Sequence, residues 1–202
     1  MTIVTIRGQL GSGAPEIGQL VATRINADYV DREVIAAVAE RVQRSSWEIV
    51  AKEEPPGTLA GRILAAFANV PSAAGPPGFQ AAYLPTWALP LDDFSYKETL
   101  VNVIKELALD PAIVIRGRGS QFILKDHPDA FHVLTVAPLA TRVTRVMEHE
   151  NLDEAEARKE IDRFDKSRRA FIRKYFGANL EDPIHYDLVI NTEHLDFEGA
   201  AA

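Results

Sequence analysis

A glycine-rich segment near the N-terminus constrains the possible folds of this chain more than any other feature of its sequence. Residues 8–13 read Gly-Gln-Leu-Gly-Ser-Gly, a composition too rich in glycine for a helix or a strand. A β-branched run at 3–6 precedes this loop, and apolar residues at helical spacing follow it from about 15 to 25. The chain therefore opens with a predicted strand, a glycine-rich loop and a predicted helix.

Short apolar runs typical of buried strands recur along the chain, with helical patterns between them. The runs fall at 28–30, 113–115, 132–136 and 186–191. Asp31 is a candidate N-cap, Ser95 with Glu98 has capping-box spacing, and Asn151 with Glu154 begins a long charged helix. About five strands separated by helices predict a three-layer α/β fold, because parallel strands need helical crossovers. We expect one domain over residues 1–202.

Composition and charge exclude several classes of protein. The 202 residues include 22 lysines and arginines against 29 aspartates and glutamates, a net charge of −7. This acidic balance argues against partners such as nucleic acid or a membrane surface, which attract basic proteins. The chain has no cysteine, no apolar run long enough to span a membrane and no secretory-signal pattern at its start. We therefore expect a soluble cytoplasmic protein.

Residues 71–92 differ from the rest of the chain in their many prolines and glycines. Strand and helix patterns resume after them, so we interpret the segment as an excursion from one domain rather than as a linker. Phe79, Tyr83 and Trp87 recur there every four residues. This spacing fits packing in a core better than stacking on nucleic-acid bases.

The glycine-rich loop is a candidate phosphate site because of its position between a strand and a helix N-terminus. Backbone N–H groups can point inward at an anion there, and the helix dipole adds to the attraction. Gly8 and Gly13 have the glycine spacing of a P-loop, but Ala14 and Pro15 replace its lysine and its serine or threonine. A tight structural turn is the alternative interpretation of the glycines, although their place between a strand and a helix favours phosphate binding.

Two arginines end the predicted strand at 113–115. Arg116 and Arg118 alternate with Gly117 and Gly119 at the carboxyl end of that strand, the edge where open α/β sheets bind ligands. The forked donors of a guanidinium suit phosphate recognition. Solvated charge at the end of a strand is the alternative interpretation.

A basic stripe runs along the long charged helix that begins near residue 151. Its members are Arg163, Lys166, Arg168, Arg169, Arg173 and Lys174. Such a stripe suits a lid that closes cations over transferring phosphates, although the interleaved acidic residues equally favour a solvated helix face. The five histidines lack metal-ligand spacing, so we predict no metal site built on them.

Several segments, taken in order, resemble the cytidylate kinase-like family. They lie at 3–13, 28–35, 113–124, 136–142, 165–168 and 186–192. The resemblance implies a P-loop nucleoside monophosphate kinase fold with a helical lid over 151–183 and an acceptor-binding insertion over 31–95. It also implies transfer of the γ-phosphoryl group of ATP to CMP or dCMP with Mg²⁺, and small nucleotides as partners.

The resemblance also assigns site residues by position. The donor phosphates would lie on Gly8, Gly11, Ser12 and Gly13, and the acceptor would lie on Asp31, Arg32 and Arg118. Arg118, Asp165 and Arg168 would act in catalysis, the last two as the Asp-x-x-Arg of the lid. The remaining lid cations would be Arg163, Lys166, Arg169 and Arg173.

The departures from the family pattern concern the phosphate and magnesium contacts. The family often has an arginine where this chain has Pro15, and an aspartate where it has Arg116. We hypothesise that Arg7 or Arg116 replaces the missing lysine in binding the donor phosphates. Three functions stay open: a cytidylate kinase, a catalytically silent nucleotide-binding or sensing module, and a kinase acting on another small acceptor.

Overall fold

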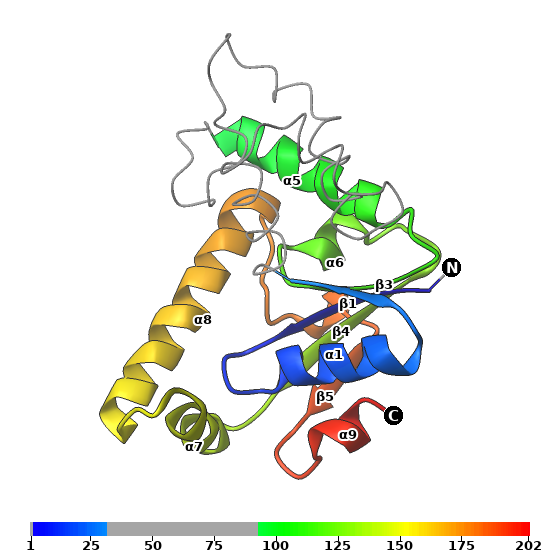
Figure 1. Ribbon diagram of the computed structural model, residues 1–202. Coiled ribbons are helices and arrows are strands. Elements are labelled where there is room, and N and C mark those ends of the chain that lie inside the picture. Colours follow the sequence, from blue (N-terminus) through cyan, green and yellow to red (C-terminus); the bar gives the residue numbers. More distant parts are fainter. Residues whose placement is uncertain (1, 32–92) are drawn as a thin grey trace, which may run out of the picture. The chain divides into compact units, whose positions relative to one another are not determined.

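The computed structural model describes residues 2–31 and 93–202, and within them a five-stranded sheet (Figure 1). The strands are β1 (Thr2–Gly8), β2 (Asp28–Val30), β3 (Ala112–Arg116), β4 (Ala130–Val136) and β5 (Leu188–Asn191). Their order is β2-β3-β1-β4-β5, and β1 pairs in parallel with both β3 and β4. β4 also pairs in parallel with β5. The predicted strands are therefore confirmed.

Contacts divide the chain into two compact units, one of Met1–Tyr29 with Ala112–Ala202 and one of Val30–Pro111. The second unit contains α5 (Asp93–Leu107), which begins two residues before Ser95. The expected helix start at Ser95 is therefore wrong, although the helix is present and buries the apolar residues of its stripe. The predicted helix after Asp31 and the segment 71–92 with its aromatics lie outside the described residues.

The helix α1 (Ala14–Arg24) covers one face of the sheet. Pro15 stands in its first turn, where a missing N–H leaves no helical hydrogen bond unmade. Ile17 packs there with Ile6 of β1 and Val114 of β3 in one buried cluster. Burying a side chain of this size away from water stabilises the folded state by about 1.5–3 kcal/mol. This packing fixes α1 directly behind the glycine-rich loop.

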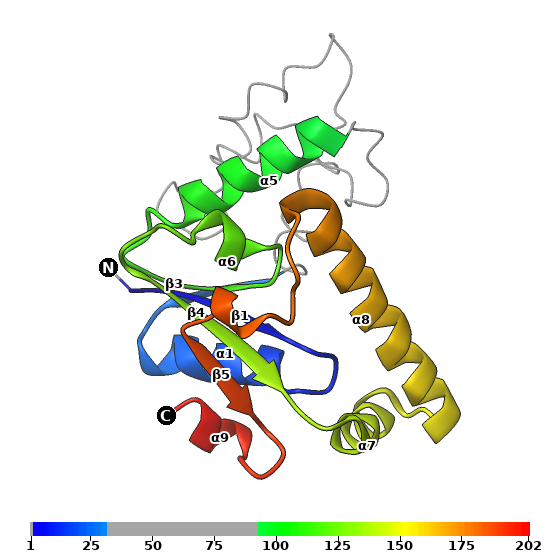
Figure 2. The ribbon, with the colours of Figure 1, turned by 180° about the vertical axis from the view of Figure 1, so that it is seen from behind.

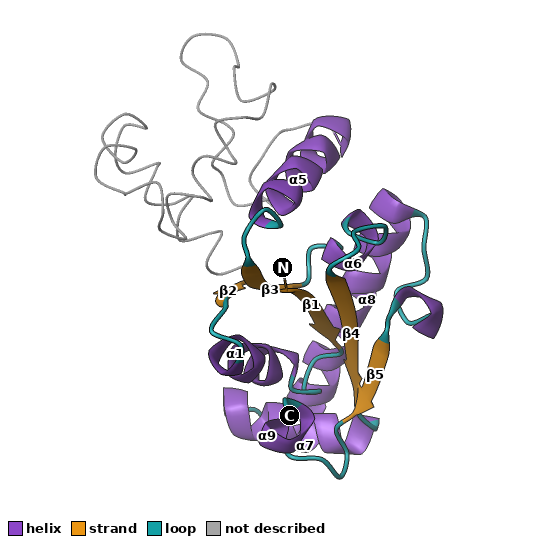
Figure 3. Cartoon of the chain, turned by 90° about the vertical axis from the view of Figure 1, so that its right-hand side faces the viewer, coloured by secondary structure: helices purple, strands orange, loops and turns teal. Residues whose placement is uncertain are grey.

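The opposite face of the sheet carries the short helix α6 (Ser120–Ile123). Figure 3 shows α1 and α6 on opposite sides of the strands, which confirms the three-layer arrangement. Side chains alternate along a strand, so Thr5 and Arg7 face away from the cluster that contains Ile6. On that side Thr5 Oγ1 lies 2.7 Å from Nδ1 of His132 on β4.

The helices α7 (Leu139–Glu150) and α8 (Glu154–Phe176) pack against each other through the buried cluster of Val143, Val146, Ala157 and Ile161 (Figure 2). α8 begins at Glu154, as expected, but its cap is Asp153 in a capping box with Glu156, so the expected cap at Asn151 is wrong. Asn151 instead ends α7 in a left-handed conformation, which asparagine tolerates.

The chain ends in a turn of 3₁₀-helix (Pro183–His185), β5 and the four-residue helix α9 (Phe197–Ala200). Within residues 2–31 and 93–202, no helix has both the length and the apolar character needed to span a membrane.

Candidate functional site

The loop between β1 and α1 lies at the carboxyl edge of the sheet, where the strand order reverses. From the central β1 the chain continues to β2 and β3 on one side of the sheet, and later to β4 and β5 on the other. Such a switch point is where open α/β sheets bind ligands. Ile6 of β1 pairs with Arg116 of β3, so the loops that follow these two strands are neighbours.

The three glycines of the first loop stand where a side chain would not fit. Gly11 and Gly13 have φ values of 81° and 85°, in the left-handed region that glycine favours. A Cβ at Gly13 would overlap the ring of Phe197, and one at Gly11 would lie 2.8 Å from the carbonyl oxygen of Arg142. A Cβ at Gly8 would overlap the Thr135 hydroxyl. The glycines therefore allow close packing around the loop as well as its turn.

Four consecutive carbonyl groups of this loop accept hydrogen bonds from side chains. The bonds are Ser12 Oγ to Gln9 O at 2.7 Å, Arg142 Nη1 to Leu10 O at 3.3 Å, Arg145 Nη1 to Gly11 O at 3.2 Å and Thr192 Oγ1 to Ser12 O at 3.0 Å. The donors come from the loop itself, from α7 and from the residue after β5. These four hydrogen bonds orient the carbonyl groups toward neighbouring side chains of the protein. The loop conformation is therefore held without a ligand.

Fewer of the loop's N–H groups than of its carbonyl groups form hydrogen bonds within the protein. In the described part of the chain, the N–H groups of Gly11, Gly13 and Ala14 have no hydrogen-bond acceptor, and Pro15 has no N–H. Free N–H groups of this kind at a helix N-terminus can bind a phosphate oxygen. The arrangement therefore provides donors for an anion at the start of α1.

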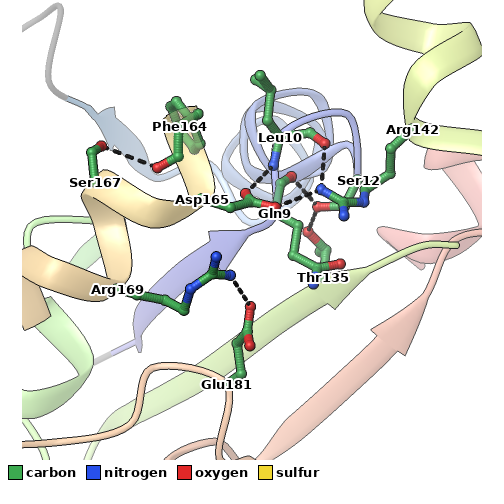
Figure 4. A network of polar contacts seen from close by, with 10 residues as sticks. All are labelled: Gln9, Leu10, Ser12, Thr135, Arg142, Phe164, Asp165, Ser167, Arg169 and Glu181. Atoms are coloured by element: carbon green, nitrogen blue, oxygen red, sulfur yellow. Dashed lines mark hydrogen bonds and ion pairs between the residues drawn. The ribbon is translucent and has the colours of Figure 1, made fainter. Parts of the chain in front are cut away.

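Asp165 and Arg142 form a buried ion pair behind the loop (Figure 4). Arg142 Nη1 lies 2.8 Å from Asp165 Oδ2, and each side chain is 8% exposed. The other carboxylate oxygen accepts the N–H of Leu10 at 3.3 Å. The pair therefore joins α7, α8 and the glycine-rich loop, and removing one partner would leave a buried charge without compensation.

Arg145 ties the loop to the end of β5. Its Nη1 donates to Thr192 Oγ1 at 2.9 Å and its Nη2 to the Thr192 carbonyl at 2.6 Å. The guanidinium also lies 5.0 Å from the centre of the Phe197 ring, within the range of a cation–π contact. Since the same ring packs on Gly13, α9 and β5 are both coupled to the loop.

Two of the expected phosphate-binding arginines lie at the end of β3 and in the loop that follows it. Gly117, Arg118 and Gly119 have φ values of 77°, 59° and 71°, so Arg118 is left-handed between two glycines. This conformation costs a non-glycine residue about 1–2 kcal/mol, and such strain concentrates at functional sites. Gly119 packs on the Phe176 ring, which connects this loop with the end of α8. Both Arg116 and Arg118 are partly exposed.

Arg7, the residue before Gly8 on β1, carries a charge in a partly buried place. Burial lowers its pKa to about 10; Arg168 also lowers the pKa, while Tyr186, Asp165 and Glu181 raise it. Arg7 is therefore a cation at neutral pH. Burial also raises the pKa of Tyr186, whose hydroxyl accepts from Gln121 Nε2 at 3.2 Å and donates to Leu180 O at 2.6 Å.

Most of the expected lid cations lie on the exposed side of α8. Arg163 pairs with Glu160, which raises the pKa of Arg163 and lowers that of Glu160, and Lys166 pairs with Asp162 at 2.8 Å. Arg169 pairs with Glu181 at 3.1 Å (Figure 4), and Arg173 is exposed. Arg168 lies 4.7 Å from the centre of the Phe164 ring. Asp165 on the same helix is buried, so the structure separates it from these cations.

Two of the three residues expected on the acceptor belong to the second unit, and the third, Arg118, belongs to the first. Asp31 directly follows β2 and is 9% exposed. Arg32 lies outside the described residues.

Sequence analysis missed four residues that hold the loop. They are Thr135, Arg145, Thr192 and Phe197. It also gave Asp165 a catalytic role in the lid by resemblance and did not foresee its burial, although a signal for that burial was present. Asp165 follows Ala157 and Ile161 at four-residue spacing on the buried stripe of α8, and Ile172 continues that stripe.

A family comparison decides the classification of the chain. The model of the cytidylate kinase-like family matches residues 3–194. The chain belongs to the cytidylate kinase-like family. The P-loop kinase-type fold expected from the resemblance is thereby confirmed, together with its parallel sheet.

Curated relatives of this family member are distant. The cytidylate kinase of Thermoplasma acidophilum is 32% identical over 84 residues, 41% of this chain and 45% of that protein. The cytidylate kinase of Staphylothermus marinus is 29% identical over 118 residues, 58% of this chain and 61% of that protein. The chain spans about half the length of the curated relatives it matches.

Among solved structures, an uncharacterized protein from Eubacterium ventriosum has the same fold. The TM-score is 0.68 at 20% sequence identity, and the match covers 100% of this chain and 94% of that one. At this identity the likeness concerns the fold alone.

Magnesium, which the family implies, fits the described residues poorly at the loop. Pro15 stands where a P-loop has the hydroxyl that binds the ion. The hydroxyl of Ser12 is fully buried and lies 2.7 Å from Thr135 Oγ1, so it does not replace that ligand. Among the described residues, no three histidine or acidic side chains gather into a possible metal site.

Proposed function

We propose that this protein transfers the γ-phosphoryl group of ATP to CMP or dCMP. The observation that carries the proposal is the glycine-rich loop, whose carbonyl groups are bonded to the protein while three N–H groups remain for an anion. Family membership supports the reaction class, and the curated cytidylate kinases support the acceptor. On this proposal the protein is a transferase that binds two nucleotides.

In this proposal the loop binds the phosphate chain of the donor. The N–H groups of Gly11, Gly13 and Ala14 contact phosphate oxygens, and the dipole of α1 adds to the attraction. Asp165 acts as a positioning residue, because its carboxylate is already engaged by Arg142 and by the loop. The loop is therefore preorganised for the donor.

The arginines supply the charge that phosphoryl transfer requires. Arg118 binds the acceptor phosphate and Arg168 the transferring group, and Arg116 adds positive charge beside them. Asp31 and Arg32 contact the acceptor nucleoside. An acceptor phosphate oxygen attacks the γ-phosphorus while the bond to the β-phosphate oxygen breaks, so no covalent enzyme intermediate forms. Positioning and electrostatic stabilisation are then the whole contribution of the protein.

A specific observation favours a second candidate, a catalytically silent nucleotide-binding or sensing module. Ala14 and Pro15 remove the lysine and the hydroxyl that a P-loop contributes to catalysis, and among the described residues no three histidine or acidic side chains gather to hold magnesium. A third candidate keeps the kinase reaction and changes the acceptor to another small metabolite.

A phosphoryl-transfer assay with a panel of nucleoside monophosphates and Mg-ATP tests the proposal. We expect CMP and dCMP to be converted to diphosphates, and Arg118→Ala to lower kcat/KM by about 100-fold through loss of a charged contact. The matched control is Arg158→Ala, because Arg158 is an exposed arginine on α8 paired only with Glu154 among the described residues. ATP binding without turnover on any acceptor would favour the silent module, and turnover on other acceptors alone would favour the third candidate.

A further inference from the structure

Arg7 differs from the other arginines around the loop in lacking a bonded partner. Arg142 and Arg145 each donate to the loop and to a second group, whereas the guanidinium of Arg7 makes no hydrogen bond or ion pair among the described residues. Arg7 belongs to the central strand β1 and directly precedes Gly8, the first residue of the glycine-rich loop. A partly buried cation without a bonded carboxylate is costly to the fold.

The groups around Arg7 do not neutralise it. Arg168 adds a second positive charge nearby, and the acidic groups that face Arg7, Asp165 and Glu181, are paired with Arg142 and Arg169 respectively. Tyr186 is the remaining titratable neighbour, and burial keeps its hydroxyl protonated at neutral pH. The surroundings of Arg7 therefore favour an anion.

The position that carries the P-loop lysine is unsuited to supply this charge. Ala14 is 4% exposed and packs in the buried cluster with Ile6 and Ile17. Arg7 leaves the same strand one residue later than Ile6 and on the opposite face. A cation therefore lies near the carboxyl end of β1, on the face of the sheet opposite Ile6.

We propose that Arg7 is the residue that binds the phosphate chain of the donor in place of the missing lysine, with Arg168 as the second cation. The ligand class is a polyphosphate, either free or as part of a nucleoside triphosphate. The inference rests on the proposed function only for the identity of that ligand. The cost of burying Arg7 is then offset when the anion binds, which couples phosphate binding to stability.

Two readouts distinguish this role from a structural one. Arg7→Gln removes the buried charge, so the ligand-free variant should melt about 2–4 °C higher than the wild type, whereas loss of a structural contact would lower Tm. Titration with inorganic tripolyphosphate and with ATP, followed by calorimetry, should show affinity reduced about 10- to 100-fold. Arg7→Lys should retain part of the affinity, because it keeps the charge.

The matched control is Arg24→Gln, since Arg24 is an arginine of the same unit whose side chain is 39% exposed and pairs with Glu198. It should leave both Tm and tripolyphosphate affinity unchanged. Unchanged affinity in Arg7→Gln, or a lower Tm in both Arg7 variants, would overturn the inference. Arg7-dependent binding in a protein that phosphorylates no acceptor would support the inference while the proposed kinase activity fails. Phosphoryl transfer that survives Arg7→Gln unchanged would overturn the inference alone.

Discussion

Two aspartates on α8, three residues apart, form ion pairs of equal length in different surroundings. Asp165 lies 2.8 Å from Arg142 and both side chains are 8% exposed. Asp162 also lies 2.8 Å from its partner Lys166, but these side chains are 58% and 69% exposed. Water screens the outer pair, so its charges contribute little, while the inner pair is strongly interdependent. Burial, rather than the presence of charge, separates a loop anchor from a solvated helix face.

The largest effect is expected when the inner pair is broken. Asp165→Asn keeps the shape of the side chain but leaves the buried charge of Arg142 without a partner. The free energy of unfolding should fall by about 3–5 kcal/mol. The measurement is urea denaturation followed by circular dichroism. Asp162→Asn is the matched control and should change stability by less than about 0.5 kcal/mol; equal losses in the two variants would refute the distinction.

The next largest loss of stability is expected at Arg145, which holds the loop from a partly buried position. Arg145→Met removes the charged hydrogen bonds to Gly11 O and Thr192 while keeping much of the apolar length of the side chain. Unfolding free energy should fall by about 1.5–3 kcal/mol. Arg158→Met, which breaks an exposed pair on α8, should cost only about 0.3–0.5 kcal/mol. Indistinguishable denaturation midpoints would argue that Arg145 does not hold the loop.

Replacing both members of the inner pair separates its stabilising role from its positioning role. In Arg142→Met/Asp165→Leu the buried charges are gone, so stability should return to within about 1 kcal/mol of the wild type. The contacts to the N–H and carbonyl of Leu10 are lost as well. ATP affinity should therefore stay reduced in a titration even though the fold has recovered. Recovery of both properties would show that the pair serves stability alone.

The smallest effect on stability is expected from His132, a buried polar side chain without a charge. Burial lowers the pKa of His132 below 6.5, although Asp187 opposes the shift. Below pH 6.5 the unfolded chain therefore binds more protons at this residue than the folded protein does. Stability should decrease as the pH falls from 7 through 6.5 toward the folded-state pKa. His132→Gln should reduce this slope in denaturation curves measured between pH 5 and 7.5, and an unchanged slope would contradict the assignment.

The sheet and the glycine-rich loop could be predicted because their signals are local. β-Branched runs such as 113–115 are buried on both faces of a parallel sheet, and Gly11 and Gly13 stand where positive φ values are needed. Helix starts were less predictable. Asp153 competes with Asn151 for the cap of α8, and only the left-handed end of α7 decides between them.

The anchors of the loop could not be predicted because their contacts are distant in sequence. Thr192 and Ser12 are 180 residues apart, and Arg145 and Gly11 are 134 apart. No period or motif connects such positions, since the parallel sheet brings the ends of β1, β4 and β5 together only after folding. The catalytic roles assigned to Arg118, Asp165 and Arg168 by resemblance stay predictions.

The proposed function depends most directly on the loop N–H groups, which form the proposed phosphate site. The decisive measurement follows the backbone amide resonances of Gly11, Gly13 and Ala14 by ¹⁵N NMR while ATP is added, with adenosine as the control ligand. We predict large shifts of these three resonances with ATP and small ones with adenosine, while the amide of Gly177 at the end of α8 stays unchanged. Resonances of Gly11, Gly13 and Ala14 that do not respond to ATP would contradict the account.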